Sequence, residues 1–234
     1  MMILDLFCGA GGASMGYHKA FPDAEIVGVD NVPQPNYPFE FIQMDVMDPD
    51  FDFDFDIFSF DLIHASPPCQ AYSTLSYAPG AKTYPTMVEA TRALMEANDV
   101  PWVIENVPGA PLREPFQLCG TSFGLTTGAL GITWELRRHR IFETSFDVWA
   151  PPVCSHRYKA IGVYGDLSNA PRPNNPNRRR PFNDDGTPAN DWKAGFMMAG
   201  DVMGIDWMTP GELVEAIPPT YTEWIGNQLT GLLR

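Results

Sequence analysis

One cysteine and one glutamate each follow a short apolar run, where their side chains are suited to chemistry. Cys69 lies in Ser66-Pro67-Pro68-Cys69-Gln70, directly after the apolar run 60–65, and the two prolines restrict the backbone before the thiol. Glu105 closes the run 102–105, and a half-buried carboxyl group there can have a raised pKa and donate a proton. A thiol and an acid at neighbouring strand ends suit nucleophilic addition to a ring, assisted by protonation of a ring nitrogen. Taken singly, Cys69 could be an inert buried thiol, which is the commoner fate of a lone cysteine, and Glu105 could be half of a structural ion pair.

A glycine-rich turn near the N-terminus is suited to a nucleotide-like ligand. The segment Asp5-Leu6-Phe7-Cys8-Gly9-Ala10-Gly11-Gly12 passes from an apolar run into a helical pattern. Glycines let the backbone approach a ligand closely, and Asp30 closes the next strand, where a carboxylate can bind ribose hydroxyls. The spacing is not Gly-x-Gly-x-x-Gly, and Lys19 comes too late for a P-loop, which leaves an adenosine ligand without a pyrophosphate. S-adenosylmethionine fits this description, and a purely structural turn is the alternative.

A sheet is needed to bring these residues together, and the apolar runs predict one. The expected strands are residues 2–7, 25–29, 41–46, 60–65 and 102–105, and the expected helices between them are 11–21 and 86–98. This alternation predicts an α/β fold with a doubly wound, mostly parallel sheet, in which ligands bind beyond the carboxyl ends of the strands.

The sequence changes character after Thr144, where Pro, Asn, Gly and Arg become frequent. One strand is expected at 158–164, and helices are expected at 210–216, begun by a capping box of Thr209 and Glu212, and at 222–233. We therefore predict a catalytic core of residues 1–143 plus 197–234 and a small inserted target-recognition module of residues 144–196.

Composition limits the possible functions. The chain has 234 residues with 15 basic and 29 acidic side chains, a formal net charge of −14. Its four cysteines have no paired spacing, which excludes a disulfide scaffold and a zinc ribbon. Because no apolar run approaches the roughly 18 residues that span a bilayer, and no signal peptide is recognisable, we expect a cytoplasmic protein without membrane contact. Cys154 and His156 could form half of a metal site, but without two further matched ligands we expect no metal.

The net charge opposes binding to nucleic acid, but the charge is unevenly distributed. Residues 137–180 hold nine basic and three acidic side chains, whereas residues 1–61 hold twelve acidic and one basic. Residues 137–180, the basic segment, are therefore the part of the chain suited to phosphate contacts.

Five short motifs, taken together and in order, resemble those of C5-cytosine DNA methyltransferases. They are Asp5-Leu6-Phe7-Cys8-Gly9-Ala10-Gly11-Gly12, Pro68-Cys69-Gln70, Glu105-Asn106-Val107, Arg138-His139-Arg140 with Ile141-Phe142, and Gly226-Asn227-Gln228-Leu229. The resemblance covers residues 2–143 and 197–234. It implies a Rossmann-like methyltransferase fold, S-adenosylmethionine as cofactor, and double-stranded DNA as the partner of a protein expected to be monomeric.

The resemblance also implies a role for each matching residue. Cys69 would attack C6 of a cytosine flipped out of the duplex, Glu105 would supply the N3 proton and Arg140 would hold O2. Arg138 would contact a phosphate or the loop that carries Cys69. The expected cofactor-binding residues are Phe7, Gly9, Gly11, Gly12, Asp30, Asn31, Asp45, Val46, Pro67, Asn227 and Leu229. The expected DNA-binding residues are Gln70, Ser73, Arg157, Lys159, Arg172, Arg178, Arg179 and Arg180.

Two departures from the family pattern keep more than one function open. Leu136 stands where a glutamine is expected two residues before Arg138, and the region after Phe142 is short, which predicts a short or relaxed recognition sequence. An RNA cytosine methyltransferase is one alternative, although Gln70 favours DNA because related tRNA enzymes tend to carry Pro-Cys-Phe-like variants. The pattern is also compatible with a non-catalytic DNA-binding protein, with transfer of a group other than methyl, and with an enzyme that depends on a specificity partner. A bacterial cell or a phage-infected host is the expected setting.

Overall fold

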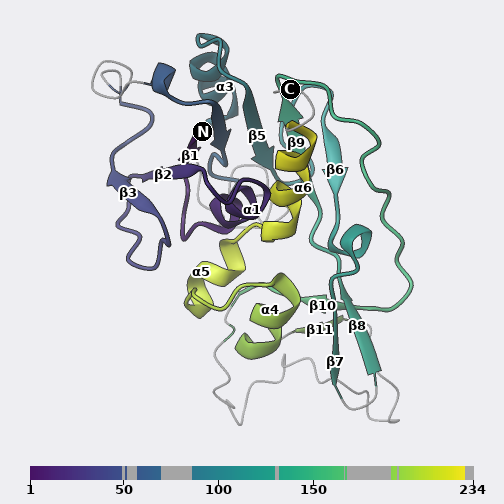
Figure 1. Cartoon of the computed structure of the whole chain (residues 1–234). Helices are drawn as coiled ribbons and strands as arrows, with labels where there is room; N and C mark the ends of the chain where they lie inside the picture. Colours follow the sequence, from purple (N-terminus) through teal and green to yellow (C-terminus); the bar gives the residue numbers. More distant parts are fainter. Residues whose placement is uncertain are drawn as a thin grey trace.

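A seven-stranded sheet forms the larger part of the protein (Figure 1). The computed structural model describes residues 1–48, 51, 57–69, 86–129, 132–165, 167, 191–193 and 195–229. The strand order is β3 (Glu40–Gln43), β2 (Glu25–Asp30), β1 (Met2–Leu6), β4 (Leu62–Ala65), β5 (Trp102–Asn106), β9 (Arg140–Thr144) and β6 (Phe116–Leu118). The first five strands run parallel, and β9 lies antiparallel to both β5 and β6. The order reverses between β1 and β4, so their carboxyl ends form the crevice where doubly wound sheets bind ligands.

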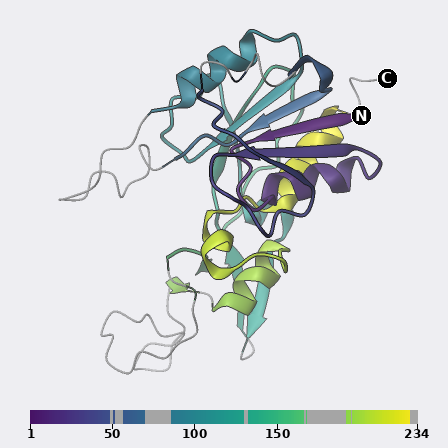
Figure 2. The same ribbon diagram turned by 90° about the vertical axis from the view of Figure 1, so that its left-hand side faces the viewer.

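Helices cover both faces of this sheet (Figure 2). The helices are α1 (Gly12–Ala20), α3 (Val88–Glu96), α4 (Phe196–Met203), α5 (Pro210–Glu215) and α6 (Pro219–Leu229), with 3-10 turns η1 (Ile57–Ser59) and η3 (Gly120–Phe123). Helix α3 packs on one face with Leu4 and Leu6 of β1, while α1 and α6 pack on the other with Ile3. A Cβ atom on Gly16 would lie 2.0 Å from the carbonyl oxygen of Pro219, so α1 and α6 touch through this glycine. The two ends of the chain therefore share one core.

A second, four-stranded sheet lies below the first in Figure 1. Its order is β11 (Asp191–Lys193), β10 (Lys159–Gly162), β8 (Ile132–Leu136) and β7 (Thr126–Ala129). Helix α4 packs against this sheet in a core that contains Trp134, Ile161 and Val202. Among the described residues, the predicted module of residues 144–196 supplies β10 and β11, whereas β7 and β8 precede it and α4 begins at its last residue. The second sheet therefore includes strands from the sequence before the module.

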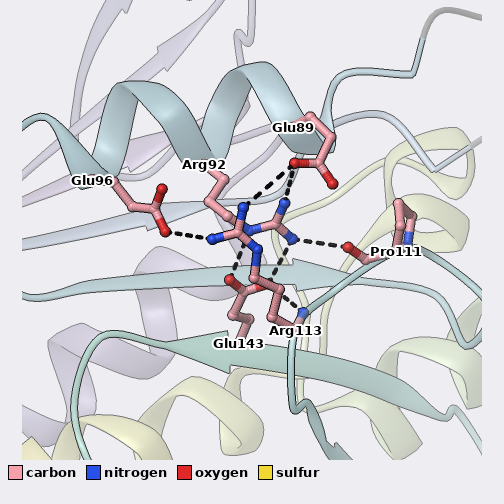
Figure 3. A network of polar contacts seen from close by, with 6 residues as sticks. All are labelled: Glu89, Arg92, Glu96, Pro111, Arg113 and Glu143. Atoms are coloured by element: carbon pink, nitrogen blue, oxygen red, sulfur yellow. Dashed lines mark hydrogen bonds and ion pairs between the residues drawn. The ribbon is translucent and has the colours of Figure 1, made fainter.

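A buried arginine ties α3 to β9 and to the loop after β5 (Figure 3). Arg92 is 0% exposed, and its Nε and Nη2 each donate a 2.8 Å hydrogen bond to one carboxylate oxygen of Glu143. Nη2 also donates to the carbonyl oxygen of Pro111 at 2.8 Å, and Nη1 forms a 2.6 Å ion pair with Glu89. The backbone N–H of Arg113 donates to Glu143 at 2.7 Å. This bidentate pair therefore secures the loop after β5 and the strand that begins with Arg140.

Most expected elements are present with shifted ends. The expected strand 41–46 is β3, which ends at Gln43, and the expected helix 222–233 is α6, which begins at Pro219. The capping box of Thr209 and Glu212 is confirmed, with both reciprocal hydrogen bonds formed. Strands β6 to β9 and β11 were not predicted. Among the helices of the described ranges, none is both long and apolar enough to cross a membrane.

Candidate active site

Cys69, Glu105 and Arg140 meet near the carboxyl ends of β4 and β5. Cys69 lies four residues beyond β4, Glu105 lies in β5, and Arg140 begins β9. The Nε of Arg140 is 2.9 Å from Oε1 of Glu105, in an ion pair whose side chains are 15% and 7% exposed. Both charges also act on the half-buried thiol of Cys69. The fold therefore brings the expected nucleophile, acid and base-holding arginine into one site.

Asn106, which was not among the expected site residues, holds the loop that leads to Cys69. Its Nδ2 donates a buried 2.9 Å hydrogen bond to the carbonyl oxygen of Pro67, and its Oδ1 accepts one of 2.9 Å from the backbone N–H of Val107. On the other side, the backbone N–H of Ser66 donates to the carbonyl oxygen of Leu6 at 3.1 Å. The backbone before the thiol is thus held by both neighbouring strands. The position of Asn106 in the Glu-Asn-Val motif was the sequence signal for this role.

Glu105 is a buried acid with a raised pKa. Burial raises the pKa of its carboxyl group, while Arg140, Arg138 and a hydrogen bond with Ser66 act in the opposite direction. Its buried Oε1 has no hydrogen-bond partner among the described residues, because the nearby Nε of Arg140 is not aligned for one. A buried carboxyl group with an available oxygen can give a proton to a ring nitrogen of a ligand.

A chain of buried hydrogen bonds supports Glu105 from within the sheet. The hydroxyl of Ser66 bonds to Glu105 and lies 2.9 Å from Nε2 of His64, whose Nδ1 is 2.9 Å from the hydroxyl of Tyr17 on α1. Burial lowers the pKa of His64 to about 3, so the imidazole is neutral and donates through one nitrogen only. Donation from Tyr17 to His64, then to Ser66, then to Glu105 satisfies each of these groups and orients the carboxyl group.

The Cys69 thiol is coupled to the protonation of Glu105. Burial raises the pKa of Cys69, Arg140 lowers it, and the negative charges of Glu105 and Glu215 raise it. A proton on Glu105 removes one of these negative charges and therefore favours the thiolate of Cys69. An acid that is protonated when the nucleophile is ionised is the combination required for addition to a ring.

Arg138 is a partly buried anchor between the two sheets. Its Nη1 donates to the carbonyl oxygen of Val163 at 2.9 Å, and its Nη2 to that of Val214 at 2.6 Å. The hydroxyl of Tyr221 donates to the Arg138 carbonyl oxygen at 2.6 Å. Burial lowers the pKa of Arg138 to about 9, and the charge of Arg140 adds to this effect. The expected contact of Arg138 with a phosphate or with the loop of Cys69 stays a prediction.

The glycine turn leaves room for a ligand beside Asp30. Gly9 has φ of 50°, and no described atom lies within 4 Å of the position that a Cβ atom would occupy there. Its backbone N–H donates to Asp30 at 3.1 Å, and that of Val32 donates to the other Asp30 oxygen at 3.0 Å. Phe7, with φ of 56°, also adopts the left-handed conformation that sharpens this turn. Open space above a glycine at the reversal of strand order fits S-adenosylmethionine.

The other expected cofactor residues divide into packing and exposed positions. A Cβ atom on Gly11 would lie 2.8 Å from Pro38, and one on Gly12 would lie 2.5 Å from the carbonyl oxygen of Ile217, so both glycines allow close packing. Exposed side chains belong to Asn31, Asp45 and Asn227, and buried ones to Val46, Pro67 and Leu229. Leu229 packs in the core with α1.

A pocket of about 480 Å³ opens between residues 136–140 and 160–164, at the junction of the two sheets. Part of the charge of the basic segment is already paired there, because Arg137 forms a 2.7 Å ion pair with Glu135. The Nε of Arg157 donates to the hydroxyl of Ser155 at 3.2 Å, and Lys159 begins β10. Outside the described residues lie Gln70, Ser73, Arg172, Arg178, Arg179 and Arg180.

Known structures with similarity to this chain are methyltransferases. The Entamoeba histolytica methyltransferase EhMeth aligns over 100% of this chain and 99% of its own, at 12% identity and a TM-score of 0.49. The plantazolicin methyltransferase BpumL, in complex with SAH, aligns over 46% of this chain and 39% of its own, at 17% identity and a TM-score of 0.29. An antibiotic-related methyltransferase aligns over 61% and 87%, at 11% identity and a TM-score of 0.34.

Sequence comparison adds a family assignment. No curated protein sequence matches the chain. Residues 1–113 match the family model described as C-5 cytosine-specific DNA methylase. The matched range contains the glycine turn, Cys69 with its two preceding prolines, and the Glu105-Asn106-Val107 segment of β5. Through these residues, the segment 1–113 resembles the C-5 cytosine-specific DNA methylase family.

Proposed function

We propose that the protein is a DNA (cytosine-5)-methyltransferase that acts on a flipped-out cytosine of double-stranded DNA through a covalent adduct of Cys69. The observation that carries this proposal is the 2.9 Å ion pair between Arg140 and the buried Glu105, whose charges both act on the half-buried thiol of Cys69. An available acid, a guanidinium and a thiol are the groups needed to hold and activate a cytosine ring.

S-adenosylmethionine is the methyl donor, and it supplies an electrophilic methyl group when bound beside Gly9 and Asp30. The thiolate of Cys69 forms a bond to C6 while Glu105 gives its proton to N3, so the electron pair of the C5–C6 double bond becomes available at C5. C5 would take the methyl group, which leaves S-adenosylhomocysteine. C5 then gives its proton to solvent, N3 returns its proton to Glu105 and the C6–sulfur bond breaks, which restores the double bond and releases the thiolate of Cys69.

Arg140 has two tasks in this scheme. Its ion pair with Glu105 holds the carboxyl group in place, and its remaining donors can bind the carbonyl oxygen of the base. The charge of Arg140 also lowers the pKa of Cys69 against the effect of burial. One guanidinium therefore assists both the acid and the nucleophile.

The pocket between residues 136–140 and 160–164 is suited to DNA because it lies beside Arg140 and between the two sheets. Arg157 and Lys159 lie close in sequence to residues 160–164, which line this pocket. With Gln70, Ser73, Arg172 and Arg178–Arg180, these residues are the proposed contacts to phosphates and bases. The small second sheet favours a short recognition sequence.

The test is transfer of a labelled methyl group from S-adenosylmethionine to duplex DNA and, in parallel, to RNA of the same sequence. Wild-type protein should label cytosine in the duplex, and Cys69→Ala should label neither substrate. Label in RNA alone would replace the DNA proposal by the RNA alternative. Equal behaviour of wild type and Cys69→Ala, with DNA bound but unmodified, would identify a non-catalytic binding protein.

A trapping experiment addresses the covalent step. With 5-fluorocytosine in the duplex, C5 carries fluorine in place of the proton that must leave, so the adduct of Cys69 cannot be released. Wild-type protein should form a complex with DNA that survives denaturation, and Cys69→Ser should not. Methyl transfer to normal DNA without any trapped complex would contradict the covalent mechanism.

A further inference from the structure

Two thiols and two imidazoles lie together at the junction of the two sheets. One ligand atom from each of Cys119, His139, Cys154 and His156 lies within 4.8 Å of all the others. Cys119 directly precedes η3, His139 lies between β8 and β9, and the other two lie in the segment before β10. The Sγ of Cys119 is 3.6 Å from Nε2 of His156, and the rings of His139 and His156 have centroids 5.3 Å apart. These four residues, the Cys2His2 cluster, belong to three separate segments of the chain.

We propose that the Cys2His2 cluster binds one zinc ion. Zinc in structural sites takes four sulfur or nitrogen ligands at the corners of a tetrahedron. With bonds of about 2.0–2.3 Å, neighbouring ligand atoms of such a site lie roughly 3.3–3.8 Å apart. The 3.6 Å between Cys119 and His156 already falls in this range, and the 4.8 Å limit on the other pairs requires only side-chain adjustment. Sulfur with imidazole selects zinc over magnesium or calcium, which prefer oxygen.

The backbone that carries the ligands is held in place by protein contacts. The N–H of Ser155 donates to the hydroxyl oxygen of Thr121 at 3.3 Å. The N–H groups of Arg157 and Tyr158 donate to one oxygen of the buried Glu135 on β8, at 3.0 and 2.9 Å. Cys154 and His156 are thus presented to Cys119 by a segment whose position does not depend on a metal, which is the preorganisation that a metal site requires.

The surroundings of the cluster also suit a metal. The hydroxyl of Thr121 lies 3.1 Å from Sγ of Cys119 and can donate to its thiolate, a typical outer contact of a metal-bound cysteine. The four ligand residues differ in exposure: Cys119 is 1% exposed, His139 and Cys154 are half-buried, and His156 is exposed. An ion can therefore reach the cluster from solvent and be bound against a buried thiolate.

The position of His139 gives the zinc ion a structural role. His139 lies between Arg138, which anchors the two sheets, and Arg140, which pairs with Glu105. A zinc ion on His139 fixes this segment to the loop before η3 and to the segment before β10. With four protein ligands the site has no open position for a substrate, so zinc positions Arg140 without taking part in the reaction.

The first test measures zinc in the full-length protein, purified without chelator, by elemental analysis. Wild type and Cys69→Ser should each hold one zinc ion per chain, whereas Cys154→Ser and His156→Ala should hold none. Cys69→Ser is the matched control, because it removes a half-buried thiol outside the cluster. His156→Ala guards against misfolding, since the side chain that it removes is exposed. Zinc at the same level in wild type and in both cluster variants would overturn the proposal.

The second test replaces zinc by Co²⁺, whose absorption spectrum reports its ligands. Wild type should show a thiolate-to-cobalt charge-transfer band, which His156→Ala weakens and Cys154→Ser weakens further. A chelator should lower the thermal stability of wild type but not of His156→Ala, and should speed hydrogen exchange at residues 137–140. If the denatured wild-type protein shows two reactive thiols in place of four and takes up no metal, Cys119 and Cys154 form a disulfide and the zinc proposal is refuted. Failure of methyl transfer would leave all of these measurements unaffected.

Discussion

Two buried titratable residues stand side by side beneath α1, and they should shift stability with pH in opposite directions. Asp5 of β1 and His64 of β4 are register partners in the parallel sheet. Asp5 accepts a short hydrogen bond from Ser14, and His64 bonds to Tyr17, so both side chains point to α1. Burial raises the pKa of Asp5 from 3.8 to about 7 and lowers that of His64 from 6.5 to about 3.

The magnitudes follow from proton linkage. The folded state holds the Asp5 proton more tightly than the unfolded state, so this contribution to stability is complete below pH 3.8 and is lost as the pH rises to about 7. That interval corresponds to about 4 kcal/mol in the free energy of unfolding. The contribution of His64 is complete above pH 6.5 and is lost as the pH falls to about 3, an interval that corresponds to about 5 kcal/mol. In the wild type the two effects nearly cancel over the range in which both act.

Single substitutions should uncover each effect. We expect the free energy of unfolding of Asp5→Asn, relative to wild type, to rise by about 4 kcal/mol between pH 4 and pH 8. That of His64→Gln, relative to wild type, should rise by about 3 kcal/mol as the pH falls from 6.5 to 4. Urea unfolding at each pH measures these differences, in which the other titrating groups cancel. Asp23→Asn, on the exposed surface, is the matched control. If both variants follow the wild-type curve in parallel, the two burial effects are absent and the reasoning is refuted.

Three further predictions concern packing and positioning. Asn106→Ala leaves a buried carbonyl without its 2.9 Å hydrogen bond, so urea unfolding should show a free energy of unfolding lower by about 1–3 kcal/mol. The trapped DNA complex should also form more slowly in this variant. An unchanged trapping rate would contradict the positioning role of Asn106. Gly16→Ala places a Cβ atom 2.0 Å from a backbone oxygen of α6, so unfolding should show a loss of about 1–3 kcal/mol, whereas Gly211→Ala, with open space around it, should be neutral or stabilising. Arg92→Met leaves the buried Glu143 carboxylate without its partner and should lower the free energy of unfolding by about 3–5 kcal/mol in the same assay. The double variant with Glu143→Leu should recover part of this loss. Additive losses in the double variant would contradict a coupled pair.

The parallel strands of the large sheet were largely predictable because most of them are buried on both faces. Runs such as Met2–Leu6 and Trp102–Asn106 are mostly apolar, and the helices between them carry clear periods. Of the second sheet, only β10 was predicted, as the expected strand 158–164. Thr126–Ala129 and Asp191–Lys193 are short and polar, and they become strands only by pairing with partners far away in the sequence.

The candidate site, like the fold, was predictable from the sequence only in part. Cys69, Glu105 and Arg140 were recognisable from their motifs, and the family match over residues 1–113 includes the first two of them. The role of Arg138 was not recognisable, because its partners are backbone carbonyls of residues 163 and 214, which any sequence would offer. The chain of hydrogen bonds through His64 was missed for the same reason, since a lone histidine in an apolar strand carries no signal of its partners.

The sequence by itself determined the chemistry: a thiol after two prolines, an acid at a strand end, and a glycine turn, each set by residues adjacent in the chain. Only the tertiary structure decided how the acid is oriented, how the arginines are used and whether the cysteines and histidines meet. The sequence shows Cys154 and His156 as two neighbouring metal ligands, which is half of a metal site. Cys119 and His139 complete the cluster only because β6, β8, β9 and β10 converge at the junction of the two sheets. Local chemistry depends on neighbouring residues and can be recognised in the sequence. Contacts between distant segments depend on the packing of strands, which becomes visible only in the folded chain.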